Sequence, residues 1–442
     1  MSKVADKIKV GLTTLGCKVN QYESAALAED LQQKDYFLVP FSCFADVYII
    51  NTCTVTAFSD YQARQLIRRA HRANPQAKII VTGCYAQIAA SDIAALEGVA
   101  LVVGNDQKNT IPELLLSGGT ETSRILTGDI FQQKEFHSMP LSRFIGRTRA
   151  FLKIQDGCNS FCSYCIVPFA RGRSRSMPQQ EVLSAVVNFS CQDYREIVLT
   201  GIHLGAYGHD LKPPTNLTDM IHRIIDQAGN TRIRLSSIEP GEITDDLLHL
   251  FNKEDIICPH LHIPLQSGND KILKLMKRDY DSACYRKLIE KIAATINDVA
   301  IGVDVMVGFP SEGEEEFNSS LRLLQDLPVA YLHVFPYSER PQTSAQKIQP
   351  KVTESIKRKR AAILRSLGAK KREEFTQRFL GKKLQVLVEK IKDKKTGLMK
   401  GFSQNYLPVL IDESDLSALN KVVIVQTQDI HEGKLYGKIV HG

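Results

Sequence analysis

Short apolar runs alternate with helical stretches along the first 105 residues. Between the apolar runs, apolar residues at helical spacing predict helices at Ser24–Gln33 and Tyr61–Ala73. Strands that alternate with helices are typical of βαβ units, so this part of the chain predicts a parallel sheet. The runs of strand length are Lys9–Leu15, Val47–Thr52, Lys78–Thr82 and Ala100–Val103.

The same alternation resumes with longer units after a polar stretch, Ser117–Asp129, and a weakly patterned segment to about Arg147, which together predict a linker. About six βα units follow, fewer than a complete (β/α)8 barrel contains, so we expect an incomplete (βα)6-type barrel. Its expected strands are Phe151–Gln155, Ile197–Thr200, Arg232–Ser236, Leu261–Leu265, Val303–Val307 and Leu332–Pro336. Its expected helices are Gln179–Phe189, Leu217–Gln227, Asp270–Lys277 and Glu315–Leu327.

The last part of the chain is a basic helix, residues 353–378, followed by a β-rich tail. Short strands with glycine-containing turns predict a small closed barrel of the OB kind, a fold that often binds nucleic acid. The expected strands are Leu384–Val388, Leu407–Ile411, Val422–Gln428 and Leu435–Val440. The pattern as a whole predicts an α/β chain with three domains, at residues 1–138, 144–372 and 374–442.

Composition is that of an ordinary globular protein, with 43% hydrophobic and 24% charged residues among 442. These values exclude a disordered or fibrous chain, and no apolar stretch is long enough for a membrane span. The N-terminal sequence MSKVADKIKVG lacks the apolar core of a signal peptide. We therefore expect a cytoplasmic protein without a membrane partner, whose cysteines stay reduced.

Positive charge is concentrated in one segment. Residues 351–400 have a local balance of +12, whereas the whole chain carries +7, so the rest of the chain is acidic. A basic segment at one end indicates a polyanion partner, although a solvated charged helix is the alternative. The β-rich tail that follows favours RNA.

Three cysteines follow the ends of three predicted strands: Cys17, Cys53 and Cys84 stand in LTTLGC, VYIINTC and KIIVTGC. Because the carboxyl ends of parallel strands meet at one edge of a sheet, we expect these N-terminal thiols to converge. Convergent thiolates in a reducing compartment indicate zinc or an iron–sulfur cluster, with three unrelated buried cysteines as the alternative. Structural zinc usually takes four protein ligands and close CxxC pairs, which are missing here.

Three further cysteines, Cys158, Cys162 and Cys165, form the motif CxxxCxxC in the loop after the first barrel strand. The loops after the strands build the active site of such barrels. These loop thiols can hold three irons of a 4Fe-4S cluster, and the fourth iron then remains free to bind S-adenosylmethionine (SAM). The other four cysteines are expected to be small buried hydrophobes: Cys43, Cys191, Cys258 and Cys284.

The CxxxCxxC motif at this place resembles that of the radical SAM enzymes. With three upstream cysteines and a β-rich tail, the chain resembles the methylthiotransferases, in which the tail is the TRAM domain that holds tRNA. One branch of that family modifies N6-threonylcarbamoyladenosine next to the anticodon. The motifs similar to that branch are GCKVNQYES, NTCTVT, TGCYAQ, CSYCIVPFARGRSRS, LTGIHLGAYG, LSSIEP, HLHIPLQSG and DVMVGFP. The chain departs from the family pattern at Ser311 and Gln342, where Gly is usual, and this concerns loop shape only.

The resemblance implies two 4Fe-4S clusters and two SAM molecules. The cluster on the loop thiols would reduce SAM to give a 5′-deoxyadenosyl radical, which attacks carbon 2 of the adenine ring. The cluster on the N-terminal thiols would carry or supply the sulfur, which a second SAM methylates. The implied partners are a tRNA anticodon stem-loop, a flavodoxin- or ferredoxin-type electron donor and a sulfur donor.

The resemblance also suggests residues around the cofactor. Tyr164 is the family's usual aromatic position against the adenine of SAM, or it serves loop packing. Residues at strand ends contact the cofactor or cap helices through their hydroxyls, and Gly308 allows close approach or is a turn residue. The strand-end residues are Thr200, Gly201, Ser236, Ser237 and Glu239.

RNA contacts are expected from two places. Arg171, Arg173 and Arg175 alternate just after the cluster loop, where guanidinium groups suit phosphates of an anticodon loop; a structural patch is the alternative. In the tail, Phe402 and Tyr406 are candidates for stacking on bases.

Two other functions fit part of this pattern. A methylthiotransferase for isopentenyladenosine tRNA or for a ribosomal protein would keep the chemistry and change the substrate. A non-enzymatic, metal-stabilised RNA-binding protein would contain zinc and would not cleave SAM. Iron and sulfide in the purified protein would distinguish the enzyme from this binding protein.

Overall fold

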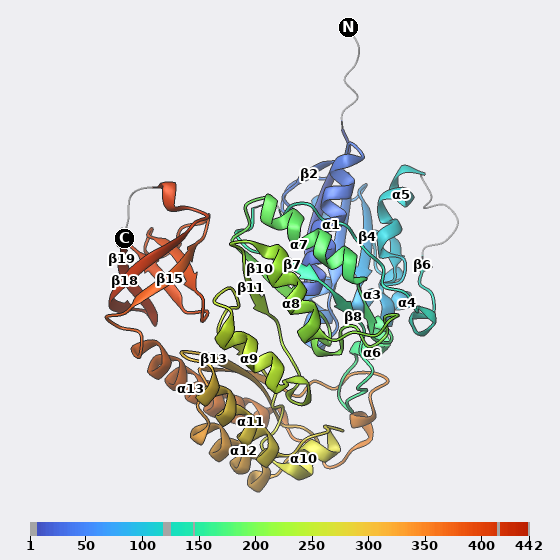
Figure 1. The fold of residues 1–442 in the computed structure, drawn as a ribbon. Helices are drawn as coiled ribbons and strands as arrows, with labels where there is room; N and C mark the ends of the chain where they lie inside the picture. Colours follow the sequence, from blue (N-terminus) through green and yellow to red (C-terminus); the bar gives the residue numbers. More distant parts are fainter. Residues whose placement is uncertain (1–6, 118–124, 145, 413–415, 441–442) are drawn as a thin grey trace.

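The N-terminal part of the chain forms a parallel sheet in the order β2-β1-β3-β4-β5-β6 (Figure 1). The structure, a computed structural model, describes residues 7–117, 125–144, 146–412 and 416–440. The strands are β1 (Lys9–Thr14), β2 (Phe37–Val39), β3 (Val47–Thr52), β4 (Lys78–Gly83), β5 (Val99–Val103) and β6 (Ile125–Leu126). All four strands predicted here are confirmed, and β2 and β6 are additional short edge strands. Residues 118–124 and 145 of the expected linker lie outside the described residues.

Helices cover this sheet and connect it to the next part of the chain. They are α1 (Lys18–Gln33), α2 (Ala57–Ala73), α3 (Cys84–Ile88), α4 (Ala90–Ala94) and α5 (Ile111–Leu116). Helix α1 begins six residues before the predicted Ser24, because its polar first turns are buried against other parts of the protein rather than exposed. Tyr22 on α1 donates to the Met139 carbonyl at 2.9 Å, which ties the helix to the segment that leads into the second sheet.

Six parallel strands form the incomplete barrel that the sequence predicts, in the order β7-β10-β11-β12-β13-β14. They are β7 (Ala150–Lys153), β10 (Glu196–Thr200), β11 (Arg232–Leu235), β12 (His260–His262), β13 (Ala300–Val307) and β14 (Tyr331–Pro336). Strands β11 and β12 lie in separate hydrogen-bonded sheets and meet through single bridges, such as Ser237 with His262. A short pair, β8 (Gln155–Asp156) with β9 (Arg175–Ser176), closes the base of the cysteine loop.

Helices lie on the outside of the incomplete barrel (Figure 1). They are α6 (Val167–Arg171), α7 (Gln179–Cys191), α8 (Leu217–Ala228), α9 (Asp245–Lys253), α10 (Asp270–Leu275), α11 (Ser282–Thr295), α12 (Glu314–Asp326) and α13 (Glu354–Gln377). Helices α9 and α11 were not predicted. The basic helix α13 packs along β14 and leads into the C-terminal barrel.

The C-terminal tail is a closed five-stranded barrel in the order β15-β16-β17-β19-β18, as predicted for a small barrel. Its strands are β15 (Lys383–Val388), β16 (Met399–Ser403), β17 (Pro408–Ile411), β18 (Val422–His431) and β19 (Lys434–Ile439). Strand β16 was not predicted, because Lys400 and Gly401 interrupt its apolar pattern. The three domain boundaries remain predictions.

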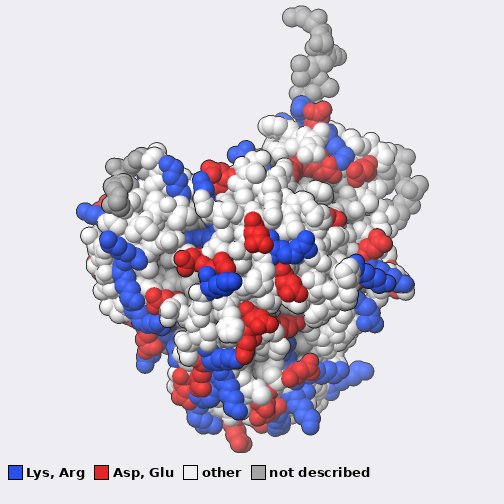
Figure 2. Space-filling model, in the orientation of Figure 1, with Lys and Arg blue, Asp and Glu red and all other residues white. Residues whose placement is uncertain are grey.

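Charged side chains of both signs are distributed over the face in Figure 2, with Lys and Arg following the outer edge of the C-terminal barrel. Within the described ranges, no helix is long and apolar enough to cross a membrane.

Candidate functional site

The three N-terminal thiols lie where the sheet topology predicts, at the carboxyl ends of three adjacent parallel strands. Cys17 follows β1 and precedes α1, Cys53 comes directly after β3, and Cys84 begins α3 directly after β4. Strands β1, β3 and β4 are neighbours in the sheet. All three cysteines line one cavity of about 1020 Å³.

The backbone around these thiols leaves little free space. Gly16 has a φ of +95°, and a Cβ at this position would lie 3.0 Å from the Cys53 Sγ. Asn20 donates to the carbonyls of Leu15 and Thr52, which fixes the turn that carries Cys17 against the end of β3. On the other side, Asn105 contacts the Cys84 Sγ at 3.7 Å and donates to the Ala170 carbonyl at 2.8 Å.

The loop thiols lie in a second place, between the ends of β7 and α6, and two side chains from other barrel loops contact them. His203 Nδ1 lies 3.4 Å from the Cys158 Sγ, and its Nε2 lies 2.7 Å from the Glu242 carboxylate. Arg278 donates to the Cys162 Sγ at 3.3 Å and forms an ion pair with Glu239. His203 and Arg278 were not predicted as site residues. Their one signal in the sequence is that they stand in loops that follow a barrel strand or helix.

The surroundings of these thiols shift their pKa values. Burial raises the pKa of Cys53 to about 11 and that of Cys165 to about 12, so without a metal these thiols stay protonated at neutral pH. At Cys158 burial also opposes ionisation, but the hydrogen bond from His203 outweighs it and lowers the pKa of the thiol. Because a metal ligates the thiolate, a bound metal ion would have to supply the positive charge that ionises Cys53 and Cys165.

Two of the predicted strand-end residues, Ser236 and Ser237, line the large cavity together with the N-terminal thiols. Ser236 is buried, and its Oγ has no hydrogen-bond partner within the described part of the chain. Burial of a hydroxyl without a hydrogen-bond partner costs folding free energy. A bound polar ligand, such as the ribose or amino group of a cofactor, would supply the missing partner of Ser236. The residues present therefore fit both an iron–sulfur cluster and SAM.

The other predicted cofactor residues make contacts with the rest of the protein. Tyr164 packs against an apolar cluster that includes Phe309. Thr200 is 2% exposed at the end of β10, and a Cβ on Gly201 would lie 2.8 Å from the Gln155 Oε1. The Gly308 N–H donates to Glu312, and its φ of +72° agrees with a turn. Glu239 forms an ion pair with Arg278. A cofactor role for these five residues stays a prediction.

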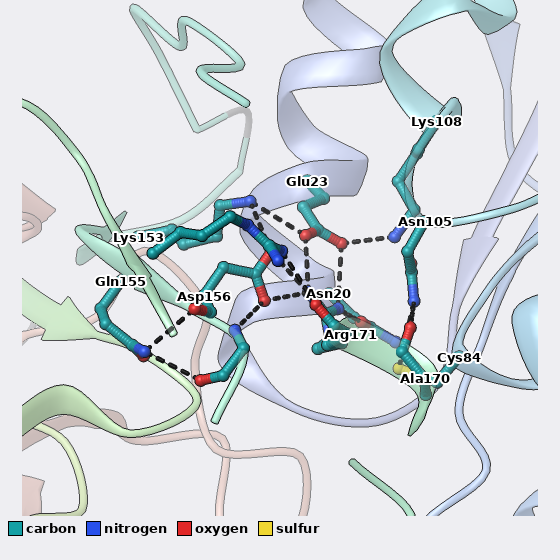
Figure 3. A network of polar contacts seen from close by, with 12 residues as sticks. Asn20, Glu23, Cys84, Asn105, Lys108, Lys153, Gln155, Asp156, Ala170 and Arg171 are labelled. Atoms are coloured by element: carbon teal, nitrogen blue, oxygen red, sulfur yellow. Dashed lines mark hydrogen bonds and ion pairs between the residues drawn. The ribbon is translucent and has the colours of Figure 1, made fainter. Parts of the chain in front are cut away.

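Arg171 corrects one of the expected RNA contacts. It is only 1% exposed, and its guanidinium lies 2.9 Å from Glu23 and 2.9 Å from Asp156 (Figure 3). Lys108 and Lys153 also contact the Glu23 carboxylate. The carboxylates of Glu23 and Asp156 compensate the positive charge of Arg171, so this side chain serves the buried network and not an exposed RNA-binding surface.

Burial opposes ionisation of Glu23, but the surrounding Arg171, Lys108 and Lys153 overcome it and hold the pKa of Glu23 well below its usual value. This network joins the helix α1 of the N-terminal sheet to the first loop of the barrel. The structural alternative for the arginine row is therefore confirmed at Arg171.

Arg175 is also buried, since its guanidinium donates to the carbonyls of Arg171 and Arg173 at 2.8 and 3.0 Å. It too is structural, which corrects the second expected RNA contact. Arg173 is exposed, and its side chain makes no polar contact with the residues that the structure describes. Of the three arginines, only Arg173 remains a candidate for RNA.

Phe402 and Tyr406 line the large cavity, at the place where the C-terminal barrel faces the N-terminal thiols. Their rings stack with centroids 5.0 Å apart, and the Arg149 guanidinium lies 4.5 Å from the Phe402 ring. Arg234 donates to the Gln404 carbonyl at 2.8 Å, which fixes this loop against β11. The aromatic pair therefore faces the same space as the N-terminal thiols.

The remaining cysteines differ from expectation. Cys258 is buried, as predicted, but Cys43, Cys191 and Cys284 are exposed, because each lies in a surface loop or on the outer side of a helix.

A polar group on the cavity wall was not predicted from the sequence. Asp304 lies 2.9 Å from His262 and 3.4 Å from His333. The sequence signals this group only through polar residues within two strands, His262 in HLH and Asp304 in DVMV.

The comparisons with known proteins agree with this geometry. Residues 9–104 match the model described as "Uncharacterized protein family UPF0004", and residues 152–324 match the radical SAM superfamily. The solved structure of a radical SAM methyltransferase, TsrM from Kitasatospora setae, has a similar fold, with a TM-score of 0.56 at 14% identity over 75% of each chain. The fold and the CxxxCxxC loop thus define a radical SAM enzyme, a class that uses a 4Fe-4S cluster and SAM.

Similar proteins with curated names show which family of radical SAM enzymes the chain belongs to. The chain is 41% identical to the threonylcarbamoyladenosine tRNA methylthiotransferase MtaB of Aquifex aeolicus, over 86% of this chain and 93% of that protein. It is 37% identical to the protein of the same name from Bacillus subtilis, over 94% of this chain and 93% of that protein. The chain belongs to the threonylcarbamoyladenosine branch of the radical SAM tRNA methylthiotransferase family. This assignment excludes the non-enzymatic RNA-binding alternative.

Proposed function

We propose that this enzyme inserts a methylthio group at carbon 2 of N6-threonylcarbamoyladenosine, next to the anticodon of tRNA. The proposal includes two 4Fe-4S clusters, on the loop thiols and on the N-terminal thiols, and two SAM molecules for each product. It also includes a flavodoxin- or ferredoxin-type reductant, a separate sulfur donor and a cytoplasmic location.

One observation carries the proposal: a single cavity is lined by the N-terminal thiols, the barrel residues Ser236 and Ser237, and the aromatic pair Phe402 and Tyr406. A base that stacks on the aromatic pair would therefore share one space with the sulfur-bearing centre. Stacking on aromatic side chains is the common way in which proteins hold an unpaired RNA base. The bound clusters and SAM would supply the radical and sulfur chemistry that an unactivated ring carbon needs.

The residues of this chain would bind and orient the reactants. His203 and Arg278 stabilise negative charge on the loop thiols, since each contacts one sulfur from a neighbouring loop. The Glu23–Arg171 network holds the two thiol groups at a fixed separation, because it joins α1, which follows Cys17, to α6, which follows Cys165. Arg173 is the proposed phosphate contact.

The first test is mass spectrometry of tRNA nucleosides from a strain that lacks the gene, complemented with the wild type or with Cys162→Ala. We expect the methylthio form to be lost, unmodified threonylcarbamoyladenosine to accumulate, and only the wild type to restore the product. Product formation by Cys162→Ala would contradict the radical assignment.

The same experiment identifies the substrate. Loss of methylthio-isopentenyladenosine, with threonylcarbamoyl nucleosides unchanged, would keep the chemistry and replace the substrate. No change in any tRNA nucleoside would contradict a tRNA substrate.

A further inference from the structure

The cavity next to the N-terminal thiols is lined by six basic side chains, of which three have carboxylate partners; Lys18, Arg147 and Arg372 have none among the described residues. Arg149 lies 2.9 Å from Glu389, Arg171 is held by Glu23, and Arg234 lies 2.8 Å from Glu196. Arg147, at the rim, donates to the Gln21 amide oxygen. A positive charge that already has a carboxylate partner adds little attraction for a second anion.

Arg372 differs from these residues. It lies on the last turns of α13, lines the same cavity and is exposed, and its side chain has neither an acidic nor a hydrogen-bonding partner among residues 7–117, 125–144, 146–412 and 416–440. Its guanidinium lies 4.9 Å from the centroid of the Tyr331 ring. A guanidinium that stacks on an aromatic face keeps its N–H donors free at its edge.

The ring under Arg372 is fixed. The Tyr331 hydroxyl lies 2.7 Å from His260 Nε2 and 3.3 Å from His262 Nδ1. A Cβ on Gly302 of the neighbouring strand would lie 2.2 Å from the Tyr331 ring, so a side chain at that position would displace it. The structure therefore positions Arg372 through a rigid aromatic support instead of an ion pair.

The nearby carboxylate does not neutralise Arg372. Asp304 lies on the adjacent strand, but its oxygen is 2.9 Å from His262 Nε2 and 3.4 Å from His333 Nδ1. Although Asp304 is largely buried, its hydrogen bonds with these imidazoles lower the pKa of its carboxyl group, so it is ionised and already partnered. Among the arginines of this cavity that the structure describes, Arg372 is thus the one with neither a carboxylate nor a hydrogen-bonding partner.

We propose that Arg372 binds the carboxylate of the threonyl group, which is the only negative charge on the modified base. This inference rests on the proposed function, because it assumes that N6-threonylcarbamoyladenosine enters this cavity. An arginine guanidinium can donate two parallel hydrogen bonds to one carboxylate, which gives a bidentate ion pair. An isopentenyl group has no atom that could accept these bonds and would leave the guanidinium unpaired, so Arg372 would select the substrate.

The test compares two anticodon stem-loops that differ only in this charge: one with the free threonyl carboxylate and one with the corresponding carboxamide. Both keep every backbone phosphate. Methylthio product is measured under anaerobic turnover for the wild type, Arg372→Gln, Arg372→Lys and Arg365→Gln. Arg365 is a matched control, because it is an exposed arginine on the same helix that does not line the cavity.

We expect wild-type kcat/KM to be about 10- to 100-fold higher for the carboxylate substrate. Arg372→Gln should remove this preference by slowing only the carboxylate substrate, and Arg372→Lys should keep part of it. Arg365→Gln should change both substrates by the same factor, because it alters only the general attraction for phosphates.

An equal loss on both substrates in Arg372→Gln would overturn the proposal and assign the residue to a phosphate or to folding. If the wild type makes no product from either stem-loop, the proposed function itself fails. The two stem-loops are then compared by equilibrium binding to the wild type and Arg372→Gln. Equal wild-type affinities would overturn the carboxylate site as well.

Discussion

The guanidinium Nη1 of Arg171 lies 2.9 Å from the Glu23 Oε1, although 148 residues separate them in the chain. Both side chains are buried, and Lys108, Lys153 and Asp156 complete the network (Figure 3). The contact joins the helix that follows the first N-terminal thiol to the helix that follows the last loop thiol. The relative position of the two candidate cluster sites therefore depends on a buried ion network.

Glu23→Gln should destabilise the protein strongly, because it leaves three buried cations with one carboxylate fewer. Removing one partner of a buried ion pair typically costs about 3–5 kcal/mol of unfolding free energy. Urea unfolding followed by circular dichroism measures the change. Asp30→Asn on the same helix is the control, since its ion pair with Lys34 is partly exposed and should contribute less than about 1 kcal/mol. Equal effects of the two substitutions would contradict the importance of the network.

The same network predicts acid sensitivity. Because the pKa of Glu23 is lower in the folded protein than in the unfolded chain, its contribution is complete above the unfolded value of about 4.3. It is lost as the pH falls below that value toward the folded pKa. Unfolding free energies at pH 7, 5, 4 and 3 should therefore decrease more steeply for the wild type than for Glu23→Gln. Both proteins share all six thiols, so acid loss of iron affects them alike, and parallel curves would contradict this prediction.

Gly16→Ala should weaken iron binding by the N-terminal thiols, since the new methyl group would press on Cys53 in an unfavourable backbone conformation. With two clusters, we expect the iron content to fall from about eight toward four atoms per chain. Iron and sulfide analysis of anaerobically purified protein measures this. Gly229→Ala is a matched control, because Gly229 also has a positive φ but no atom lies within 4 Å of the added Cβ. Full iron content in Gly16→Ala would show that the space around Cys53 is not limiting.

Arg278→Gln should make the cluster on the loop thiols harder to reduce. A positive charge 3.3 Å from the Cys162 Sγ favours the reduced, more negative state, so its removal should lower the reduction potential by roughly 50–150 mV. A redox titration followed by electron paramagnetic resonance measures the shift. Arg286→Gln, at a partly exposed arginine on α11, should leave the potential unchanged. An unchanged potential in Arg278→Gln would mean that Arg278 does not tune the cluster.

Arg173→Ala should weaken tRNA binding and lower the slope of log affinity against log salt by about 1, as expected for the loss of one phosphate contact. Filter binding or fluorescence anisotropy at several salt concentrations measures both quantities. Arg286→Ala, which removes an equal charge from the surface of α11, is the control. A salt slope that stays at the wild-type value in Arg173→Ala would remove Arg173 from the interface.

Much of the fold follows from local patterns. The strands β3 and β4 are almost continuous apolar runs because both faces of a parallel sheet are covered, and such runs are readable without a structure. The convergence of Cys17, Cys53 and Cys84 followed from the same rule, since residues at the carboxyl ends of adjacent parallel strands share one edge.

Partners that are distant in sequence could not be predicted. Arg171 looks like a surface arginine in the sequence, because its partner Glu23 lies on a helix of another sheet. Helix α1 was predicted too short for the same reason: its polar first turns are buried by this network and carry no apolar periodicity. His203 and Arg278 gave no signal either, since single polar residues in loops acquire a role only through the sulfur atoms beside them.

The ion network also sets an order of events during translation. All six strands of the N-terminal sheet have been synthesised by Leu126, but Arg171 follows 45 residues later. At the usual pace of the ribosome this delay lasts roughly 2–9 s. For the first 27 of those residues Glu23 has Lys108 but neither Lys153 nor Arg171, and Arg171 is the last of the three cations to be added. The nascent sheet therefore has an incompletely compensated acid on α1. The buried network around Glu23 is therefore complete only after the cysteine loop, Cys158–Cys165, has been synthesised, which couples the final packing of the first sheet to the start of the barrel.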